Sequence, residues 1–234
     1  MICCALRAEE SPPPSQSSIL SPQSSLYDRF APLYADFRLH VFPDDRREVA
    51  AALGVAGAEH LLELGCGPGF YATAFARQFP DLAVVGIDHA PRQIALARQR
   101  AGGLPNMRFA VGDARALAQP DGAFDCVLAS RLLMVVPERE VVLAEARRVL
   151  APGGILLIAE PVRQRGSVLG LLRDAARQSG EAGGYSEPFR EHYFTAASFR
   201  ALIVSQRWAS VAIWEANGYR YARCRATTYG DGCE

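Results

Sequence analysis

A short glycine-rich segment constrains the fold of this chain more than any other feature. Residues 61–70 read Leu-Leu-Glu-Leu-Gly-Cys-Gly-Pro-Gly-Phe, so an apolar run leads directly into three glycines at alternate positions. A helix-like pattern of apolar residues follows at 70–79. A strand, loop and helix in this order let a ligand lie against bare backbone, because glycine has no β-carbon to block the approach. Glu63 is unusual here, since a phosphate would avoid its carboxylate, whereas an ammonium or a sulfonium would be attracted.

Patterns typical of strands and helices alternate through the middle of the chain. Strands are expected at 60–64, 84–87, 107–111, 124–129 and 155–160. Helices are expected at 44–53, 70–79, 91–100 and 137–150. Repeated strand–helix units predict an α/β fold with a doubly wound, mostly parallel sheet and right-handed crossovers. Ligands bind such sheets beyond the carboxyl ends of the strands. The chemically suggestive residues follow those ends: 65–69, Asp88, Asp113, Ser130, Arg131 and Glu160.

The C-terminal part departs from this alternation. Thr195 is a typical N-cap for a helix at 196–206. Two segments with alternating polarity follow at 209–216 and 219–227, and an Asn-Gly pair separates them. Asn-Gly between two such segments is a strong signal for a two-residue hairpin turn. We therefore expect a seven-stranded sheet in which an antiparallel C-terminal hairpin follows the parallel strands.

The length and local composition predict one folded domain. A chain of 234 residues suits a single full-sized core. Residues 1–25 are rich in serine and proline and are expected to form a disordered leader. The domain is expected to span 26–234, with N-terminal helices at 26–53 and an insertion at 161–194 that covers the site. No apolar run has the length of a membrane span, so no integral membrane segment is expected.

Charge and cysteine content exclude several functional classes. The formal net charge is zero, which does not provide the basic surface that nucleic acid requires. All 25 cationic residues are arginine, so lysine cannot serve as a Schiff-base former or general base. The six cysteines have no Cys-x-x-Cys spacing, and no metal site is expected. We interpret them as free thiols in a cytoplasmic protein.

The glycine loop alone leaves three interpretations open. A dinucleotide site has the pattern Gly-x-Gly-x-x-Gly, but the third glycine here comes one residue early and follows a proline. A tight strand-to-helix turn without a ligand is the second interpretation. A site for S-adenosylmethionine, whose sulfonium and ammonium suit a nearby carboxylate, is the third.

Four segments of the surrounding chain favour the third interpretation. They are Glu63–Gly69, Val84–Asp88, Gly112–Ala114 and 148–156. In their order and spacing they resemble the motifs of class I S-adenosylmethionine-dependent methyltransferases that act on small molecules. The resemblance extends from about Tyr27 to Thr227, and its first helix is similar to that of ubiquinone and menaquinone C-methyltransferases.

This resemblance implies a Rossmann-like methyltransferase fold with S-adenosyl-L-methionine as the cofactor. Asp88 is then placed to accept hydrogen bonds from both ribose hydroxyls, and Asp113 from the adenine amine beside Ala114. His89 would flank the adenine ring, and Glu63 would orient backbone amides or meet the methionyl ammonium through water. The expected cofactor-binding residues are Tyr27, Glu63, Gly65, Cys66, Gly67, Gly69, Asp88, His89, Asp113, Ala114 and Ser130.

The expected reaction is displacement of a methyl group from a sulfonium. Alignment of the acceptor supplies much of the acceleration, and a base is needed only if the acceptor must lose a proton. His192 is the candidate base, because it lies in the 161–194 insertion beside Tyr193 and Phe194. The apolar and aromatic insertion favours a small, fairly hydrophobic acceptor, methylated on oxygen, nitrogen or carbon.

Two other functions compete with this hypothesis. An NAD(P)-dependent oxidoreductase has a similar topology, but the glycine spacing, Glu63 and the absence of a Tyr-x-x-x-Lys pair argue against it. A catalytically silent subunit that only binds the cofactor and supports a partner is the second alternative, and the intact cofactor motifs argue against it. The oligomeric state is left open, with a homodimer among the options.

Overall fold

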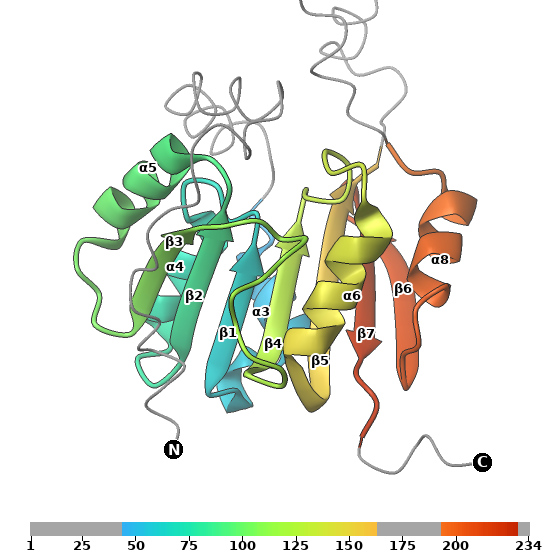
Figure 1. Cartoon of the computed structure of the whole chain (residues 1–234), viewed down its shortest axis with the longest axis horizontal. Helices are drawn as coiled ribbons and strands as arrows, with labels where there is room; N and C mark the ends of the chain where they lie inside the picture. Colours follow the sequence, from blue (N-terminus) through green and yellow to red (C-terminus); the bar gives the residue numbers. More distant parts are fainter. Residues whose placement is uncertain (1–43, 163–192, 229–234) are drawn as a thin grey trace, which may run out of the picture.

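A seven-stranded sheet with helices on both faces forms the centre of the molecule (Figure 1). The computed structural model describes residues 44–162 and 193–228. The strands are β1 (His60–Leu64), β2 (Ala83–Asp88), β3 (Met107–Val111), β4 (Phe124–Ser130), β5 (Leu150–Pro161), β6 (Ser210–Ala216) and β7 (Tyr219–Arg225). The helices are α3 (Arg46–Leu53), the 3₁₀ turn η2 (Val55–Gly57), α4 (Phe70–Gln78), α5 (Pro91–Ala101), α6 (Arg139–Val149) and α8 (Ala196–Val204).

The strand order is β3-β2-β1-β4-β5-β7-β6. Strands β1 to β5 are parallel, β7 is antiparallel to β5, and β6 is antiparallel to β7. Only β7 therefore runs against the other described strands. The chain order reverses at β1, which pairs with β2 on one side and with β4 on the other. This switch point is where doubly wound sheets bind ligands, and the predicted fold class is confirmed.

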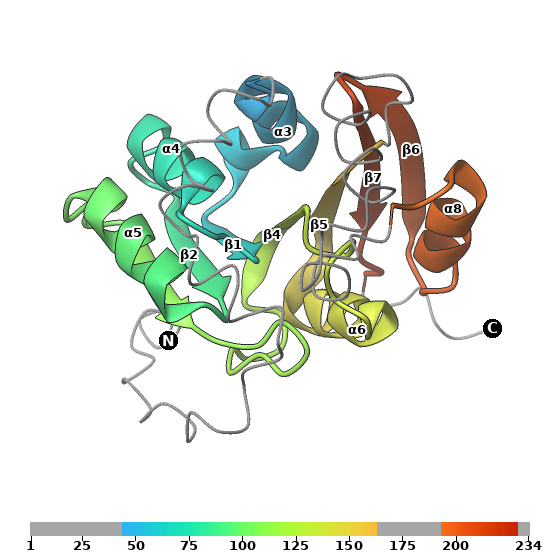
Figure 2. The ribbon, with the colours of Figure 1, turned by 90° about the horizontal axis from the view of Figure 1, so that it is seen from above.

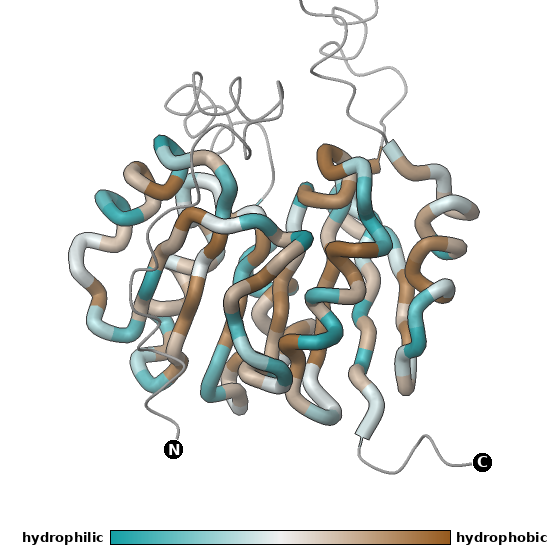
Figure 3. Tube along the Cα trace, viewed as in Figure 1, coloured by the Kyte–Doolittle hydropathy of each residue, from teal (hydrophilic) through white to brown (hydrophobic). Residues whose placement is uncertain are grey.

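Helices α3, α4 and α5 cover one face of the sheet, and α6 and α8 cover the other (Figure 2). Successive side chains of a strand point to opposite faces, so Leu61 packs with the first group of helices and Leu62 with the second. Hydrophobic residues accordingly follow one another along the central strands, whereas α5 and α6 also carry hydrophilic residues (Figure 3). A parallel sheet buried on both faces requires this continuous apolar composition.

Most element boundaries agree with the sequence prediction to within two residues. Helix α5 begins at Pro91, and the N–H that proline lacks would have had no partner within the helix at this position. The helix is closed by Gly102, which has a left-handed backbone. Thr195 and Ser198 form a capping box at the start of α8. The hairpin between β6 and β7 turns at Asn217 and Gly218, both with positive φ, as expected of this turn type.

Strand β5 differs from the prediction, because it begins at Leu150 rather than at residue 155. The Pro-Gly-Gly segment was expected to separate α6 from the strand, but the strand continues through it. The pairing register between β4 and β5 shifts between Phe124 and Cys126, and Gly153 has φ 77°. A bulge at a glycine therefore accommodates the extra residues within the strand.

A buried carboxylate links three distant segments on the α3 face. Asp45 directly precedes α3 and is buried. It accepts hydrogen bonds from the hydroxyls of Tyr71 in α4 and Tyr221 in β7, each at 2.7 Å. The Tyr221 ring stacks on Trp214 of β6. The two tyrosine hydroxyls thus provide hydrogen bonds to one carboxylate, which is buried in this mostly apolar layer.

Three of the predicted segments concern residues that the structure does not describe. The leader at 1–25, the helices expected before residue 44 and nearly all of the insertion at 161–194 lie outside the described residues. In the parts that are described, every helix is too short or too polar to cross a bilayer.

Candidate functional site

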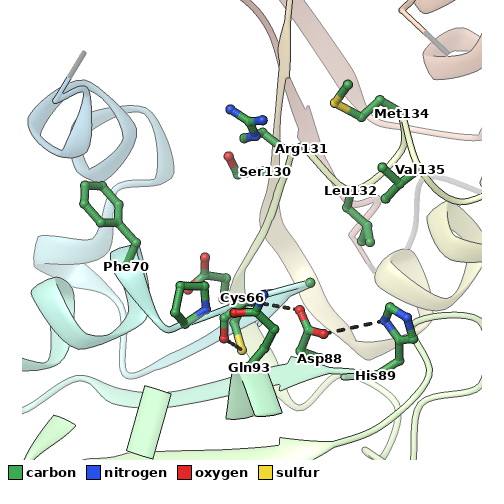
Figure 4. Close-up of a pocket in the computed structure, with 14 residues that line it drawn as sticks. Cys66, Phe70, Asp88, His89, Gln93, Ser130, Arg131, Leu132, Met134 and Val135 are labelled. Atoms are coloured by element: carbon green, nitrogen blue, oxygen red, sulfur yellow. Dashed lines mark hydrogen bonds and ion pairs between the residues drawn. The ribbon is translucent and has the colours of Figure 1, made fainter. Parts of the chain in front are cut away.

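A pocket opens beyond the carboxyl ends of β1, β2 and β4 (Figure 4). The pocket has a free volume of about 70 Å³ and is open to solvent. The lining residues are Glu63, Gly65, Cys66, Gly67, Pro68, Phe70, Asp88, His89, Gln93, Ser130, Arg131, Leu132, Met134 and Val135. Two segments supply most of them: the glycine loop, residues 65–69, and the β4 loop, residues 131–135.

The glycine loop has a backbone that only glycine adopts easily. Gly65, Gly67 and Gly69 have φ of 64°, 51° and 72°, in the left-handed region that other residues disfavour. A β-carbon at Gly65 would meet Leu132 at 2.9 Å, and one at Gly69 would meet the Phe109 ring at 2.6 Å. A β-carbon at Gly67 would meet no atom within 4 Å. Packing therefore requires glycine at position 69, whereas at Gly65 only the end of the Leu132 side chain would have to shift. Gly67 borders the open pocket.

Asp88 ties the glycine loop to the end of β2. Its Oδ2 accepts the Gly67 N–H at 2.8 Å, and its Oδ1 accepts the Ala90 N–H at 2.9 Å. The Nδ1 of His89 lies 3.5 Å from Asp88 Oδ1. An ionised carboxylate has about four acceptor positions, so these backbone bonds are compatible with further donors from a ligand. The side chain is 11% exposed and lines the pocket.

Glu63 is buried in β1 and serves as a cap for α4. Its Oε2 accepts the N–H of Ala72, in the first turn of the helix, at 2.8 Å. The N-cap residue Gly69 has no side chain for this purpose, so the neighbouring strand supplies the acceptor. Glu63 thus orients a backbone amide, the first of the two roles expected for it, while also lining the pocket.

Cys66 lines the pocket as a buried thiol. Burial raises its pKa well above the usual value, and the charges of Asp88 and Glu63 raise it further. Its Sγ packs 3.0 Å from the position that a β-carbon on Gly86 would occupy. A neutral, buried thiol is a poor nucleophile, so Cys66 fills space between β1 and β2.

Ser130 and the β4 loop form the second wall. The hydroxyl of Ser130 lines the pocket, is buried, and has no hydrogen-bond partner among the described residues. Arg131 has φ 59°, one of two positive values among the described non-glycine residues. Its N–H continues the ladder to Ala159 O at 2.9 Å, and its Nη1 donates to the Tyr219 hydroxyl at 3.4 Å. A strained residue and an orphaned hydroxyl at one place are typical of a ligand site.

Glu160, at the end of β5, lies behind this wall. It is 1% exposed, and its Oε1 accepts the Leu133 N–H at 2.7 Å. Burial raises the pKa of Glu160 to about 8, against the lowering effects of the Leu133 N–H and of Arg131. Glu160 lies at a strand end, as the sequence indicates, but it is not among the described residues that line the pocket.

Of the residues expected around adenine, His89 lines the pocket, whereas Asp113 and Ala114 do not. His89 lines it and is 39% exposed. Asp113, directly after β3, accepts hydrogen bonds from the backbone and the guanidinium of Arg115. The Arg115 hydrogen bonds hold the pKa of Asp113 below its usual range. Ala114 packs against the α6 side of the core, and neither Asp113 nor Ala114 is among the described lining residues.

The structure brings together most of the residues expected to bind the cofactor. Glu63, Gly65, Cys66, Gly67, Asp88, His89 and Ser130 line one pocket. Gly69 sits at the N-cap of α4, behind that surface. Tyr27 and His192 lie outside the described residues. Their cofactor-binding and catalytic roles remain predictions.

Several lining residues were not predicted as site residues. Gln93 is a buried polar residue of α5, and the apolar residues of the β4 loop extend the pocket wall. Gln93 lies four residues before the core residue Ala97, on the same face of α5, so a polar residue at a position expected to be buried was an available signal. The apolar run at 132–136 follows strand four without a helical or strand period, and nothing in it marks a pocket wall.

The polar and apolar groups of the pocket fit S-adenosylmethionine. Glu63 and Asp88 are acceptors for hydroxyl or ammonium donors, and they would repel a phosphate. Backbone at Gly67 is open to a ligand, and the buried Ser130 hydroxyl lacks a partner among the described residues. Leu132 and its neighbours in the β4 loop offer an apolar surface. Across the described parts of the chain, no three His, Cys, Asp or Glu side chains gather as a metal site would require.

Comparisons with known proteins point in the same direction. A family model described as a methyltransferase domain matches residues 62–158. The chain is 32% identical over 196 residues to a demethylmenaquinone methyltransferase of Deinococcus radiodurans, covering 79% of this chain and 77% of that one. It is 34% identical over 158 residues to a trans-aconitate 2-methyltransferase of Variovorax paradoxus, covering 68% and 57%. Four of the curated relatives are matched over only 32% to 63% of their length.

A solved structure shares the fold. Phosphoethanolamine N-methyltransferase 2 of Haemonchus contortus, in complex with S-adenosyl-L-methionine, superimposes with a TM-score of 0.67. The two chains are 14% identical, and the superposition covers 90% of this chain and 61% of the other. At this identity the likeness concerns the fold alone.

Proposed function

We propose that this chain, which belongs to the family of S-adenosylmethionine-dependent methyltransferases, transfers a methyl group from S-adenosylmethionine to a small acceptor molecule. The observation that carries the proposal is the contact between Asp88 and Gly67 at the switch point of the sheet. One carboxylate there fixes the open loop and remains on the pocket surface. This arrangement suits a ligand that presents hydroxyl donors beside a positive charge.

Each side chain of the site then has a defined task. Asp88 accepts hydrogen bonds from the ribose hydroxyls, while Gly67 lets the cofactor approach the backbone. Glu63 holds the first turn of α4 and provides a negative charge near the methionyl ammonium. The Ser130 hydroxyl, buried in the pocket, offers a donor or acceptor to the methionyl end. Asp113 and Ala114 serve the adenine, and His89 borders it.

The bound cofactor supplies a methyl group on a positively charged sulfur, which is already a good leaving group. The protein therefore has to align the acceptor and exclude water rather than activate the methyl group. The apolar surface of Leu132, Met134 and Val135 supports a small, fairly hydrophobic acceptor. Methylation on oxygen, nitrogen or carbon, with His192 as base where a proton must leave, completes the proposal.

The proposed setting is the cytoplasm. Cys66, Cys126 and Cys224 are free and buried, which supports a reducing compartment. The 161–194 insertion is proposed to cover the acceptor, and the zero net charge supports a small molecule rather than nucleic acid as the partner.

Calorimetry and labelled methyl transfer test this function. We expect S-adenosylhomocysteine and S-adenosylmethionine to bind, and NADH and NADPH not to bind. Transfer of labelled methyl would then be measured to phenols, quinols, amines and carboxylic acids, with trans-aconitate and a demethylmenaquinone analogue included. Binding of a nicotinamide cofactor instead would favour the oxidoreductase. Binding of S-adenosylmethionine without transfer to any acceptor, in a stable complex with a partner protein, would favour the silent subunit.

A further inference from the structure

We propose that Glu160 is a positioning residue for methyl transfer, which holds the β4 loop at a fixed distance from the glycine loop. This role rests on the proposed function, because the pocket between the two loops is taken as the cofactor site. Glu160 does not touch the pocket among the described residues; it acts through Leu133. The inference follows from a chain of contacts that runs from β5 to the glycine loop.

The first link is the backbone of Leu133, held on both sides by side chains. Its N–H donates to Glu160 Oε1 at 2.7 Å, and its carbonyl accepts from Arg139 Nε at 2.7 Å. Leu133 is fully buried. The loop also makes its own turn, since the amides of Val135 and Val136 donate to Leu132 O. Glu160 is thus a fixed acceptor from outside the turn, and it sets where the turn sits.

The second link is Leu132, the residue before this anchored amide. Its side chain occupies the space beside Gly65, so closely that a β-carbon on Gly65 would be 2.9 Å from Leu132 Cδ1. Both residues line the pocket. A displacement of the Leu133 amide would move Leu132 relative to Gly65, and this contact would no longer set the spacing of the two walls.

The surroundings of Glu160 show what else its removal would change. The other Glu160 oxygen, Oε2, is buried and has no hydrogen-bond partner among the described residues. Two arginines interact electrostatically with Glu160: Arg131 from the β4 loop and Arg139 from α6. Arg220 is its register partner on β7. Arg220 is itself bonded to Glu215. Replacing Glu160 by an apolar residue would leave the buried Leu133 N–H without this acceptor and would therefore cost stability, so the positioning role has to be tested by ligand binding and by exchange in the β4 loop.

Glutamine and leucine at position 160 separate the two roles. The amide oxygen of Glu160→Gln can still accept the Leu133 N–H, whereas Glu160→Leu fills the same space without an acceptor. Glu145→Leu is the matched control, because Glu145 also accepts a backbone N–H, that of Leu117 at 2.8 Å. Glu145 is not among the described residues that line the pocket.

The dissociation constant of S-adenosylhomocysteine is measured for each folded protein, together with the thermal midpoint and hydrogen exchange of the β4 loop. We expect Glu160→Leu to weaken binding roughly tenfold, with faster exchange in the loop. Its thermal midpoint is expected to fall as well, because the buried Leu133 N–H loses its acceptor, so binding is compared at a temperature at which every variant is folded. Glu160→Gln is expected to restore binding to within about threefold, and Glu145→Leu to bind as the wild type does.

The outcomes distinguish this inference from the proposed function. If Glu160→Leu binds S-adenosylhomocysteine as tightly as the wild type, the positioning role is wrong while the proposed function stands. If the wild type itself does not bind the compound, the proposed function is wrong, and the positioning role in methyl transfer is wrong with it. If Glu160→Gln weakens binding as much as Glu160→Leu, a hydrogen-bond acceptor at position 160 is not sufficient, which also overturns the proposal.

Discussion

The glycine loop and the β4 loop border the same pocket, but they are held in place by different parts of the chain. The glycine loop depends on residues of one strand–helix–strand unit: Glu63 caps the helix and Asp88 accepts the Gly67 N–H. The β4 loop depends on β5 and α6, through Glu160 and Arg139. The glycine loop, the first wall of the pocket, is therefore positioned by residues close to it in sequence. The β4 loop, the second wall, is positioned by tertiary contacts.

This difference indicates how the two sides of such a site can vary. A loop whose anchors lie within one unit keeps its geometry when the rest of the sheet changes, which suits a binding surface for a constant ligand. A loop anchored by other elements changes its position whenever their packing changes. The glycine loop is thus suited to the cofactor, and the β4 loop to adjusting the pocket.

The largest expected effect concerns the anchor of the first wall. Asp88→Ala removes two backbone bonds that hold the loop and the acceptor proposed for the ribose hydroxyls. We expect the dissociation constant of S-adenosylhomocysteine to rise about 100-fold, because two charge-assisted hydrogen bonds are lost. Isothermal titration calorimetry measures it. The exposed Asp81→Ala is the control, and an unchanged affinity in Asp88→Ala would remove Asp88 from the binding site.

Two alanine substitutions in the glycine loop are expected to have different effects, one mainly on folding stability and the other mainly on ligand binding. Gly69→Ala forces a β-carbon to 2.6 Å from Phe109 at a positive φ, and it should lower the free energy of unfolding by about 2–4 kcal/mol. Gly67→Ala meets no atom, so only the backbone strain of about 1–2 kcal/mol remains, while its methyl group obstructs the ligand. Urea unfolding and calorimetry measure both; equal losses of stability would contradict this division.

The anchor of the second wall makes stability depend on pH. The pKa of Glu160 is raised by burial from 4.5 to about 8, so the folded protein retains a proton that the unfolded chain releases in this range. The free energy of unfolding that protonated Glu160 contributes at low pH is therefore lost as the pH rises from about 4.5 to 8. The loss is at most about 1.4 kcal/mol per pH unit.

Urea unfolding at pH 6 and pH 7 measures this dependence. Glu160→Gln, which carries no titratable group, should show a smaller decline over this interval than the wild type. Arg131, Arg139 and Arg220 remain charged throughout, so their contribution does not change. Parallel curves for the two proteins would show that Glu160 is already ionised in this range.

The smallest effect is expected at Asp113, at the periphery of both walls. Its carboxylate is paired with the exposed Arg115, and exposed ion pairs contribute less than about 1 kcal/mol. Asp113→Asn should change the free energy of unfolding by no more than about 0.5 kcal/mol. If Asp113 also accepts from the adenine amine, the dissociation constant should rise about threefold to tenfold. Unchanged binding would place the adenine contact on the backbone.

The sequence predicted the first wall and the sheet because the signals for both are local. The apolar strand, the alternating glycines and the acid at the end of the next strand lie within residues 61–88. Helix ends at Gly54 and Gly102, and the turn at Asn217-Gly218, also depend on residues next to them. Each signal could be interpreted without knowledge of the packing.

The second wall could not be predicted in the same way. Glu160 meets Leu133 across 27 residues, and its role depends on how β5 lies beside β4. The bulge that extends β5 back to Leu150 is equally a matter of strand pairing. Arg131 has no glycine to mark its left-handed backbone. The pairing of Asp113 with Arg115 differs from these contacts, because the two residues are only two positions apart and the pair could have been predicted from the sequence.

The carboxylate of Asp45 determines how far the protein can be shortened from its N-terminal side. It is the described acceptor for the hydroxyls of Tyr71 and Tyr221, which come from the helix after the glycine loop and from the reversed strand. A truncated protein that began after this residue would remove the carboxylate that both buried phenols share and would loosen α4 and β7 together. For crystallisation, a shortened chain should therefore retain Asp45.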